Sequence, residues 1–181
     1  MSITYEVKVD WDAIDWLAVP DFTQAIDDIS DYVEHIFSDR GKSVELGNIP
    51  AGILDITLDN QDKRFTPTYS SSPLYGKMRP WLPIRVRATV TGGVVEPFYY
   101  GFISRISVNP HLDEQKAYLY CTDGMDLLAR NMVALNKSER TMITDGEAIS
   151  SILDTAGWPA AKRNIDIDTG AIVDYPQTTE Y

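Results

Sequence analysis

The chain has 181 residues, 44% hydrophobic and 24% charged, which is the composition of a soluble globular protein long enough to bury a core. Its 27 acidic and 16 basic residues give a formal net charge of −11, which disfavours tight or sequence-specific binding of nucleic acid, because that binding needs a basic surface. No apolar run approaches the about 20 residues of a membrane-spanning helix, so we expect no membrane anchor, and the single cysteine excludes an internal disulfide.

The first element that the sequence predicts is a strand over residues 4–9. Tyr5, Val7 and Val9 alternate there with polar residues, which is the pattern of a strand with one buried face. Residues 11–22 combine tryptophans with acids and a proline, and predict an irregular, partly buried connection.

Residues 29–40 admit two interpretations. Ile29, Tyr32, Val33, Ile36 and Phe37 have helical spacing, with Asp28 or Ser30 as a possible cap. The β-branched and aromatic content of the same segment equally permits a strand. From the residues alone, helix and strand both stay open.

The stretch from Gly52 to Val90 is the centre of the predicted fold. Leu54, Ile56 and Leu58 alternate with polar residues, and Ile84 and Val86 begin a second alternating series that continues to Val90. These patterns predict two strands that close over one core. The loop between them contains Pro67, Pro73 and Pro80.

Further strands follow the second of these. Gly92 and Gly93 predict a tight hairpin turn, and the returning strand, residues 94–108, carries Gly101 at its middle, where a glycine commonly marks a bulge or bend. Residues 115–121 alternate again and place Cys121 as a buried, unreactive residue. The chain is thus mainly β, and we expect an antiparallel β-barrel, or a sandwich, with a small α-helical C-terminal appendage.

The pattern changes to helical periodicity after Thr122. Thr122 or Asp123 is expected to cap a short helix that reaches Met132. Thr144 and Glu147 have the spacing of a capping box before a helix that ends at Gly157. We expect residues 1–122 to form the barrel, and residues 123–181 to form a helical appendage and the start of a second, truncated region, whose apolar residues from Ile165 to Val173 have no partner strand after them.

No catalytic, cofactor or metal site is predicted. His35 and His111 are far apart in sequence and belong to no zinc motif, and neither a nucleophile elbow nor a phosphate-binding loop is present. The acidic segments 59–62 and 166–170 lack the ligand spacing of a calcium loop. We interpret the first as a strand-ending turn, with Asp59 or Asn60 in a left-handed conformation, and the second as a solvated loop.

Two alternative functions depend on the aromatic and acidic residues of the chain. Aromatic side chains could form a sugar-stacking platform of a carbohydrate-binding β-sandwich, although packing in the core or an interface explains them as well. A fragment of a cell-wall glycan hydrolase would need a pair of carboxylates across a sugar, and no pair is singled out by the sequence. The aromatic residues concerned are Trp11, Trp16, Trp81, Tyr99 and Tyr100.

The order of motifs in the central stretch resembles a known family. In sequence order these are Leu58-Asp59-Asn60, Arg64-Phe65-Thr66-Pro67, Ser72-Pro73-Leu74-Tyr75-Gly76, Arg79-Pro80 and the strand Pro83 to Ala88. This succession is similar to the N-terminal barrel region of bacteriophage tail-tip or baseplate hub proteins, including tail-associated lysins. The resemblance covers most of the chain and favours the strand interpretation through Glu34 to Arg40.

The resemblance implies a non-enzymatic, structural role in the tail tip of a virion assembled in the host cytoplasm. Such hubs are trimers that join the tail tube to the spike or fibre-bearing tip and line the DNA channel, so the implied partners are identical copies and the tube, distal tail and spike or fibre proteins. Host attachment and genome ejection are the processes served. Hubs of this kind use two barrels per chain, and one is evident here, which implies a truncated or reduced relative.

The long loop in the middle of the chain is the candidate subunit contact. Long structured loops commonly carry binding, and this one covers residues 59–67 and 70–79. The alternative is a self-packed loop held by Phe65 and Tyr75. The residues that we select for the contact are Asp59, Asn60, Arg64, Phe65, Pro67, Tyr75 and Arg79.

Overall fold

The computed structural model describes residues 3–16, 18–39, 50–90, 92–109, 115–130, 140–160, 163–165 and 172–175. The chain divides into two compact units, Met1–Leu127 and Leu128–Tyr181. Among the described residues, no helix has the length and apolar character needed to cross a bilayer.

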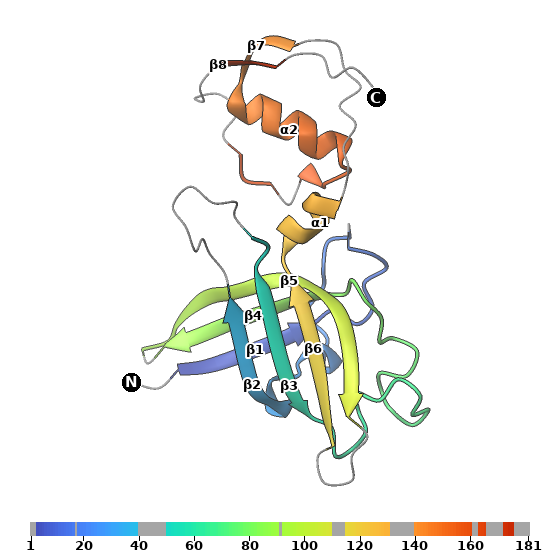
Figure 1. Cartoon of the computed structure of the whole chain (residues 1–181). Helices are drawn as coiled ribbons and strands as arrows, with labels where there is room; N and C mark the ends of the chain where they lie inside the picture. The colour runs from blue at the N-terminus through green and yellow to red at the C-terminus, as the bar shows by residue number, and fades with distance from the viewer. Residues whose placement is uncertain are drawn as a thin grey trace. The chain divides into compact units, whose positions relative to one another are not determined.

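The first unit is a single curled sheet of six strands, which confirms the mainly β prediction (Figure 1). Neighbouring strands pair antiparallel throughout, in the order β1-β4-β5-β6-β3-β2. The long strand β5 and its partner β6 lie in the middle, so the sheet's two edges are β1 and β2. The strands are β1 (Ile3–Val9), β2 (Val33–Asp39), β3 (Ile53–Asp59), β4 (Pro83–Val90), β5 (Val94–Asn109) and β6 (Lys116–Thr122).

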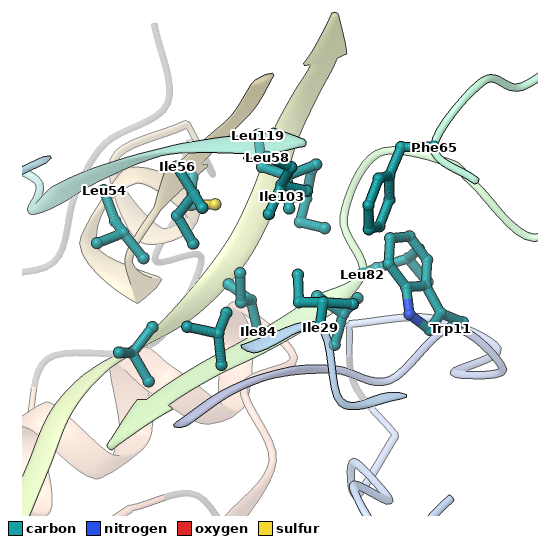
Figure 2. Packing of buried hydrophobic residues seen from close by; sticks show 14 of the residues in the cluster. Trp11, Ile29, Leu54, Ile56, Leu58, Phe65, Leu82, Ile84, Ile103 and Leu119 are labelled. Atoms are coloured by element: carbon teal, nitrogen blue, oxygen red, sulfur yellow. The ribbon is translucent and has the colours of Figure 1, made fainter. Parts of the chain in front are cut away.

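The predicted alternation of the central strands produces the core. Leu54, Ile56 and Leu58 of β3 are at most 1% exposed, and Ile84 and Val86 of β4 are fully buried. Figure 2 shows side chains from both strands converging inside the curled sheet, where Ile29 and Trp11 from the N-terminal connection join them. One face of each strand therefore supplies the core, because side chains alternate along a strand.

The edges of the sheet are linked by the segment that precedes β2. Asp28 forms an isolated antiparallel bridge with Lys8 of β1. The Ile29 N–H donates to the Val7 carbonyl oxygen at 3.0 Å, and the Val7 N–H donates to Ser30 Oγ at 2.9 Å. Two short 3-10 helices, η1 (Ala25–Asp27) and η2 (Ser30–Tyr32), shape this segment. Turns and the Ser30 side chain therefore close the curled sheet beside part of β1. Elsewhere in the sheet, neighbouring strands are joined by strand ladders.

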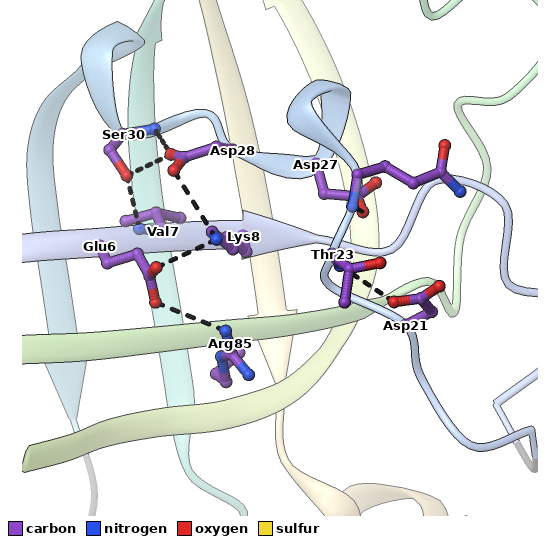
Figure 3. Close-up of polar contacts among 10 residues, drawn as sticks. Glu6, Val7, Lys8, Asp21, Thr23, Asp27, Asp28, Ser30 and Arg85 are labelled. Atoms are coloured by element: carbon purple, nitrogen blue, oxygen red, sulfur yellow. Dashed lines mark hydrogen bonds and ion pairs between the residues drawn. The ribbon is translucent and has the colours of Figure 1, made fainter.

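A row of ion pairs crosses the outside of this link (Figure 3). Glu6 accepts from Arg85 of β4 at 3.4 Å and from Lys8 at 3.1 Å, and Lys8 lies 3.9 Å from the Asp28 carboxylate. Asp28 in turn accepts from the Ser30 hydroxyl at 2.6 Å. All four charged side chains are partly exposed, so each pair adds at most about 1 kcal/mol.

The ambiguous segment at 29–40 is resolved mainly in favour of a strand. Only one 3-10 turn, η2, forms where helical spacing predicted a helix, and β2 begins at Val33. Pairing with β3 explains the outcome, because every β2 residue except Glu34, at a register shift, gains a ladder partner that a helix would not provide. Arg40 lies outside the described residues.

The long strand β5 is bent by two irregularities. In its pairing with β4, Phe98 is an extra residue that has no partner between those of Val86 and Arg87. In its pairing with β6, Ser104 is the extra residue. Gly101 lies between these bulges and pairs regularly with Ile84. The predicted bend is therefore present, but the bulges flank the glycine.

The second unit contains a helix and a two-stranded sheet. Helix α2 (Asp145–Thr155) begins with the predicted capping box, in which the Glu147 N–H donates to Thr144 Oγ1 at 3.2 Å and the Thr144 N–H donates to Glu147 Oε2 at 2.9 Å. Gly157, at φ 73°, ends it. Helix α1 (Gly124–Arg130) is capped by Asp123, whose Oδ1 accepts from the Met125 N–H; Met132 lies outside the described residues.

The apolar residues of the tail find a partner strand that precedes them in the chain. Strand β8 (Ile172–Tyr175) pairs antiparallel with β7 (Arg140–Thr144). The partner precedes α2 in the chain, so a search for strands that follow the tail misses it. The boundary between the two units falls within α1, whereas the sequence placed it after Thr122.

Candidate interaction surface

The loop between β3 and β4 is a regular ladder of turns. Backbone hydrogen bonds of 2.9 to 3.1 Å join residues three apart along it. Since each turn begins where the previous one ends, the loop has a repeating structure although it contains no helix or strand. The donors are the N–H groups of Lys63, Thr66, Tyr69, Ser72 and Tyr75, and each acceptor is the carbonyl oxygen three residues earlier.

Asn60 fixes the first turns of this ladder. Its side chain is 2% exposed, its Oδ1 accepts from the Phe65 N–H at 2.8 Å, and its Nδ2 donates to Thr66 Oγ1 at 3.0 Å. The Asn60 N–H donates to the carbonyl oxygen of Gln115, next to β6. One buried carboxamide thus holds the loop in shape, while the Asn60 N–H joins it to the sheet.

Two apolar side chains anchor the loop in the core. Phe65 is fully buried, and its ring centroid lies 5.3 Å from that of Tyr32, edge-on, and 6.5 Å from that of Trp11. Leu74 is also fully buried, and its N–H donates to Ser72 Oγ. The loop is therefore a packed part of the first unit.

The basic residues of the loop contact the rest of the unit. The Arg64 guanidinium lies 5.0 Å from the centre of the Tyr32 ring. Arg79 donates to the carbonyl oxygen of Ala13, and Lys77 forms an ion pair of 2.8 Å with Asp12. These contacts tie the far end of the loop to the N-terminal connection.

The predicted contact residues therefore divide into two groups. Asn60 and Phe65 are buried and shape the loop, and Arg64 and Arg79 make contacts inside the unit. Tyr75 is 55% exposed, and Pro67 is also exposed. Asp59 accepts from the Gln61 N–H at 3.0 Å and closes the turn after β3. The side chains left open to a partner are chiefly those of Tyr75 and Pro67.

Among known proteins, the similarity of this chain lies with solved structures. No family model matches the chain, and no curated protein matches it. A solved structure, the 43 kDa tail protein of prophage MuSo2 from Shewanella oneidensis, is similar with a TM-score of 0.44 and 10% sequence identity. The similar region covers 86% of this chain and 38% of the tail protein, so this chain spans well under half of that protein's length.

Among the described residues of this unit, two that are not glycine have a left-handed backbone. The turn after β3 was expected to use Asp59 or Asn60 in that conformation, but the residue concerned is Lys63, with φ 60°. Trp81, before β4, has φ 68°. The Asx side chains instead accept backbone hydrogen bonds within the turns, as Asp62 does from the Arg64 N–H.

The metal and nucleophile candidates gain no support. In the part of the chain that the structure describes, no three His, Cys, Asp or Glu side chains converge on one point. Burial raises the pKa of the Cys121 thiol far above its ordinary value, and Cys121 is 3% exposed, which suits an inert core residue. His111 and the acidic segment 166–170 lie outside the described residues.

The five aromatic residues of the suggested platform do not all face the surface: two are buried, Trp16 and Trp81 are partly buried, and Tyr100 is 41% exposed. Trp11 and Tyr99 are each 2% exposed and belong to the core, so neither can stack on a sugar. The Trp16 and Tyr100 rings contact Phe102 edge-on, with centroids 6.5 and 5.9 Å away. These four aromatic side chains therefore pack against other side chains of the unit and do not form one shared surface.

Sequence reasoning overlooked a pair of buried carboxylates. Asp10 is 4% exposed, and its two oxygens accept from the Asp12 and Asp21 N–H groups. Asp27 is fully buried, and burial, followed by the nearby charges of Asp10 and Asp12, raises the pKa of its carboxyl, although N–H groups of Gln24 and Trp11 oppose the shift. The alternation of acids and tryptophans in residues 10–16 was the available signal, since such acids commonly cap turns.

Proposed function

We propose that this chain is a non-enzymatic structural subunit of a phage or prophage tail, placed at the tail tip or baseplate hub. In this role it joins the tail tube to the spike or fibre-bearing tip and borders the channel through which DNA passes. It works by contact between sheets and loops of neighbouring chains. Copies of this chain, three in number by the resemblance, and other tail proteins are its partners.

The observation that carries this proposal is the turn ladder between β3 and β4. The motifs that resemble tail hub proteins, from Leu58 to Pro80, are the residues that build it. Asn60 and Phe65 hold its shape, and Tyr75 is exposed on it. A loop that is already ordered loses little conformational entropy when it docks, so it suits a permanent contact between subunits.

Exposed apolar residues elsewhere on the first unit support the same role. Ile3 and Tyr5 on β1 are 49% and 40% exposed, and Val94 and Val95 at the start of β5 are 57% and 53% exposed. Apolar side chains gathered on a surface are typical of protein contacts. Strand β2 and the start of β1, before its contacts at Val7 and Lys8, lie at the ends of the strand order and also offer backbone groups for edge-to-edge pairing.

The net charge of −11 is compatible with a position beside DNA. Acidic walls repel the phosphate backbone, and a channel that repels DNA lets it pass without adhering. Plain solubility explains the charge equally well, so this point is secondary to the loop.

The test has two parts. Mass spectrometry and immunogold labelling of purified particles are expected to find the protein at the tip of the tail, and multi-angle light scattering is expected to find a trimer. Tyr75→Ala should reduce incorporation into particles, and Glu96→Ala, an exposed change on β5, should not. Arg79 is a poorer probe because it bonds within the chain. Absence from particles, or wall-degrading activity of the purified chain in a zymogram, would overturn the proposal.

A further inference from the structure

A pocket of about 410 Å³ lies between the turn ladder and the end of the β5–β6 hairpin. The period of three that builds the ladder also brings Asn60, Lys63, Thr66 and Tyr69 to one wall. Asn109 and Gln115, at the end of the β5–β6 hairpin, complete the described lining with Thr68 and Val108. The volume falls in the range of about 300 to 1,000 Å³ that is usual for small-ligand sites.

The chemistry of the lining is specific. Six of the eight described lining residues carry a hydroxyl or a carboxamide, Val108 adds an aliphatic side chain, and most of the exposed lining surface is apolar. The Asn60 carboxamide is committed to the loop, whereas Thr68 and Gln115 make no side-chain hydrogen bond to any other described group. Lys63 is the one charged residue among the described lining residues, and no described carboxylate pairs with it. Its ammonium lies 5.8 Å from the centre of the Tyr69 ring, which is 38% exposed.

We propose that this pocket binds a saccharide. Sugar hydroxyls both donate and accept hydrogen bonds, and carboxamides and hydroxyls are the neutral side chains that can do the same. The C–H face of a sugar ring packs on an aromatic ring, which Tyr69 supplies. Lys63 adds a donor for a ring oxygen, a hydroxyl or a sugar carboxylate.

Other ligand classes fit the lining less well. A nucleotide or a polyphosphate would need several cations, and the described lining offers one, in a chain of net charge −11. A purely apolar ligand would leave the Thr68 and Gln115 groups without partners on desolvation. The site is separate from the Trp and Tyr platform considered from the sequence, and the inference does not depend on a role in a phage tail.

The test is a glycan array of bacterial surface and simple neutral and acidic saccharides, followed by calorimetric titration of the strongest hit into the full chain. Tyr69→Ala should weaken binding about tenfold or more through loss of the ring contact, and Gln115→Ala should also weaken it. Tyr100→Ala is the matched control, since Tyr100 is 41% exposed but does not line the pocket, and it should bind as the wild type does.

Thermal unfolding of each variant excludes a general loss of fold, and Tyr69→Phe, which keeps the ring, should retain binding. Two results would overturn the inference. One is an array with no saccharide bound above background. The other is binding that survives Tyr69→Ala and Gln115→Ala or that is lost in Tyr100→Ala, because the sugar would then bind elsewhere.

Discussion

Gly101 on β5 and Thr122 at the end of β6 approach each other so closely that a Cβ added to Gly101 would lie 2.4 Å from the Thr122 carbonyl oxygen. The Tyr99 ring would lie 2.7 Å from the same Cβ. Backbone cannot yield as a flexible side chain can, so this position requires glycine for space.

Replacing this glycine should therefore destabilise the sheet. Gly101→Ala is expected to lower the free energy of unfolding by about 1 to 3 kcal/mol, as overpacking of a tight site does. Urea denaturation measures the change. Glu96→Ala, exposed on the same strand, should stay within about 0.5 kcal/mol of the wild type. An equally mild effect at Gly101 would mean that β5 and β6 separate readily there.

Asn60 should govern the order of the turn ladder. Asn60→Ala removes the acceptor of the Phe65 N–H and the donor to Thr66, and should cost about 2 kcal/mol or more. Asn60→Asp keeps the acceptor and should cost less. Hydrogen exchange of the Phe65 amide reports the local effect, with Gln61→Ala, an exposed neighbour, as the control. Unchanged exchange at Phe65 in Asn60→Ala would contradict this role.

The capping box should stabilise α2 locally. Thr144→Ala leaves the Glu147 N–H without its acceptor and is expected to cost about 1 kcal/mol. Glu147→Gln keeps both reciprocal hydrogen bonds and serves as the control. Amide exchange along residues 146–150 separates this local loss from the stability of the first unit. Faster exchange in Glu147→Gln than in Thr144→Ala would reverse the expected order.

The buried carboxyl of Asp27 should make stability depend on pH. Burial, with the charges of Asp10 and Asp12, raises its pKa in the folded state above the ordinary 3.8. The folded chain then holds the proton more tightly than the unfolded chain, so the stabilisation is complete below 3.8 and is lost as the pH rises through the raised pKa.

Asp27→Asn should remove this loss. The amide oxygen can still accept from the Gln24 N–H, which now lies 3.1 Å from Asp27 Oδ2. We expect the variant to gain stability relative to the wild type as the pH rises from acid to neutral, measured by urea denaturation across pH. Circular dichroism checks that the fold is kept. If the stability of Asp27→Asn relative to the wild type stayed constant or fell as the pH rose, the result would contradict the raised pKa of Asp27.

Ser30 should hold β1 to the segment before β2. Ser30→Ala removes the acceptor of the Val7 N–H in a fully buried residue and should cost about 1 to 3 kcal/mol. Ser30→Thr retains the hydroxyl and is the control. Exchange of the Val7 amide is the sensitive readout. If Ser30→Ala leaves it protected, other bonds suffice to hold this edge.

The framework of the first unit was predictable because period-2 alternation in β3, β4 and β6 follows directly from burial on one face. For residues 29–40 the residues alone left helix and strand open, because their spacing satisfies a helix and only the distant pairing with β3 decides for a strand. The family resemblance favoured a strand from Glu34 onward, and β2 forms there. The pairing of β8 with β7 depends on a partner that precedes α2, which a local pattern does not reveal.

The candidate surface was located by its length and prolines but not in its detail. The alternative of a self-packed loop named Phe65 and Tyr75 as its anchors; Phe65 is buried against Tyr32 and Trp11, which lie far away in sequence, whereas Tyr75 is 55% exposed. No local sequence pattern predicts that Lys63 and Tyr69 line a pocket. The turns that repeat every three residues arise from backbone hydrogen bonds that ordinary loop residues can make.

The link between β1 and the start of β2 has a consequence for how the molecule comes apart. Each neighbouring strand pair in the sheet is held by a ladder that is interrupted only at bulges, whereas among the described residues this junction depends on one bridge, the two hydrogen bonds at Val7 and solvent-screened charges. Parting there breaks the fewest bonds, so the curled sheet can open along this junction while β1 stays paired with β4 and the six strands keep their ladders.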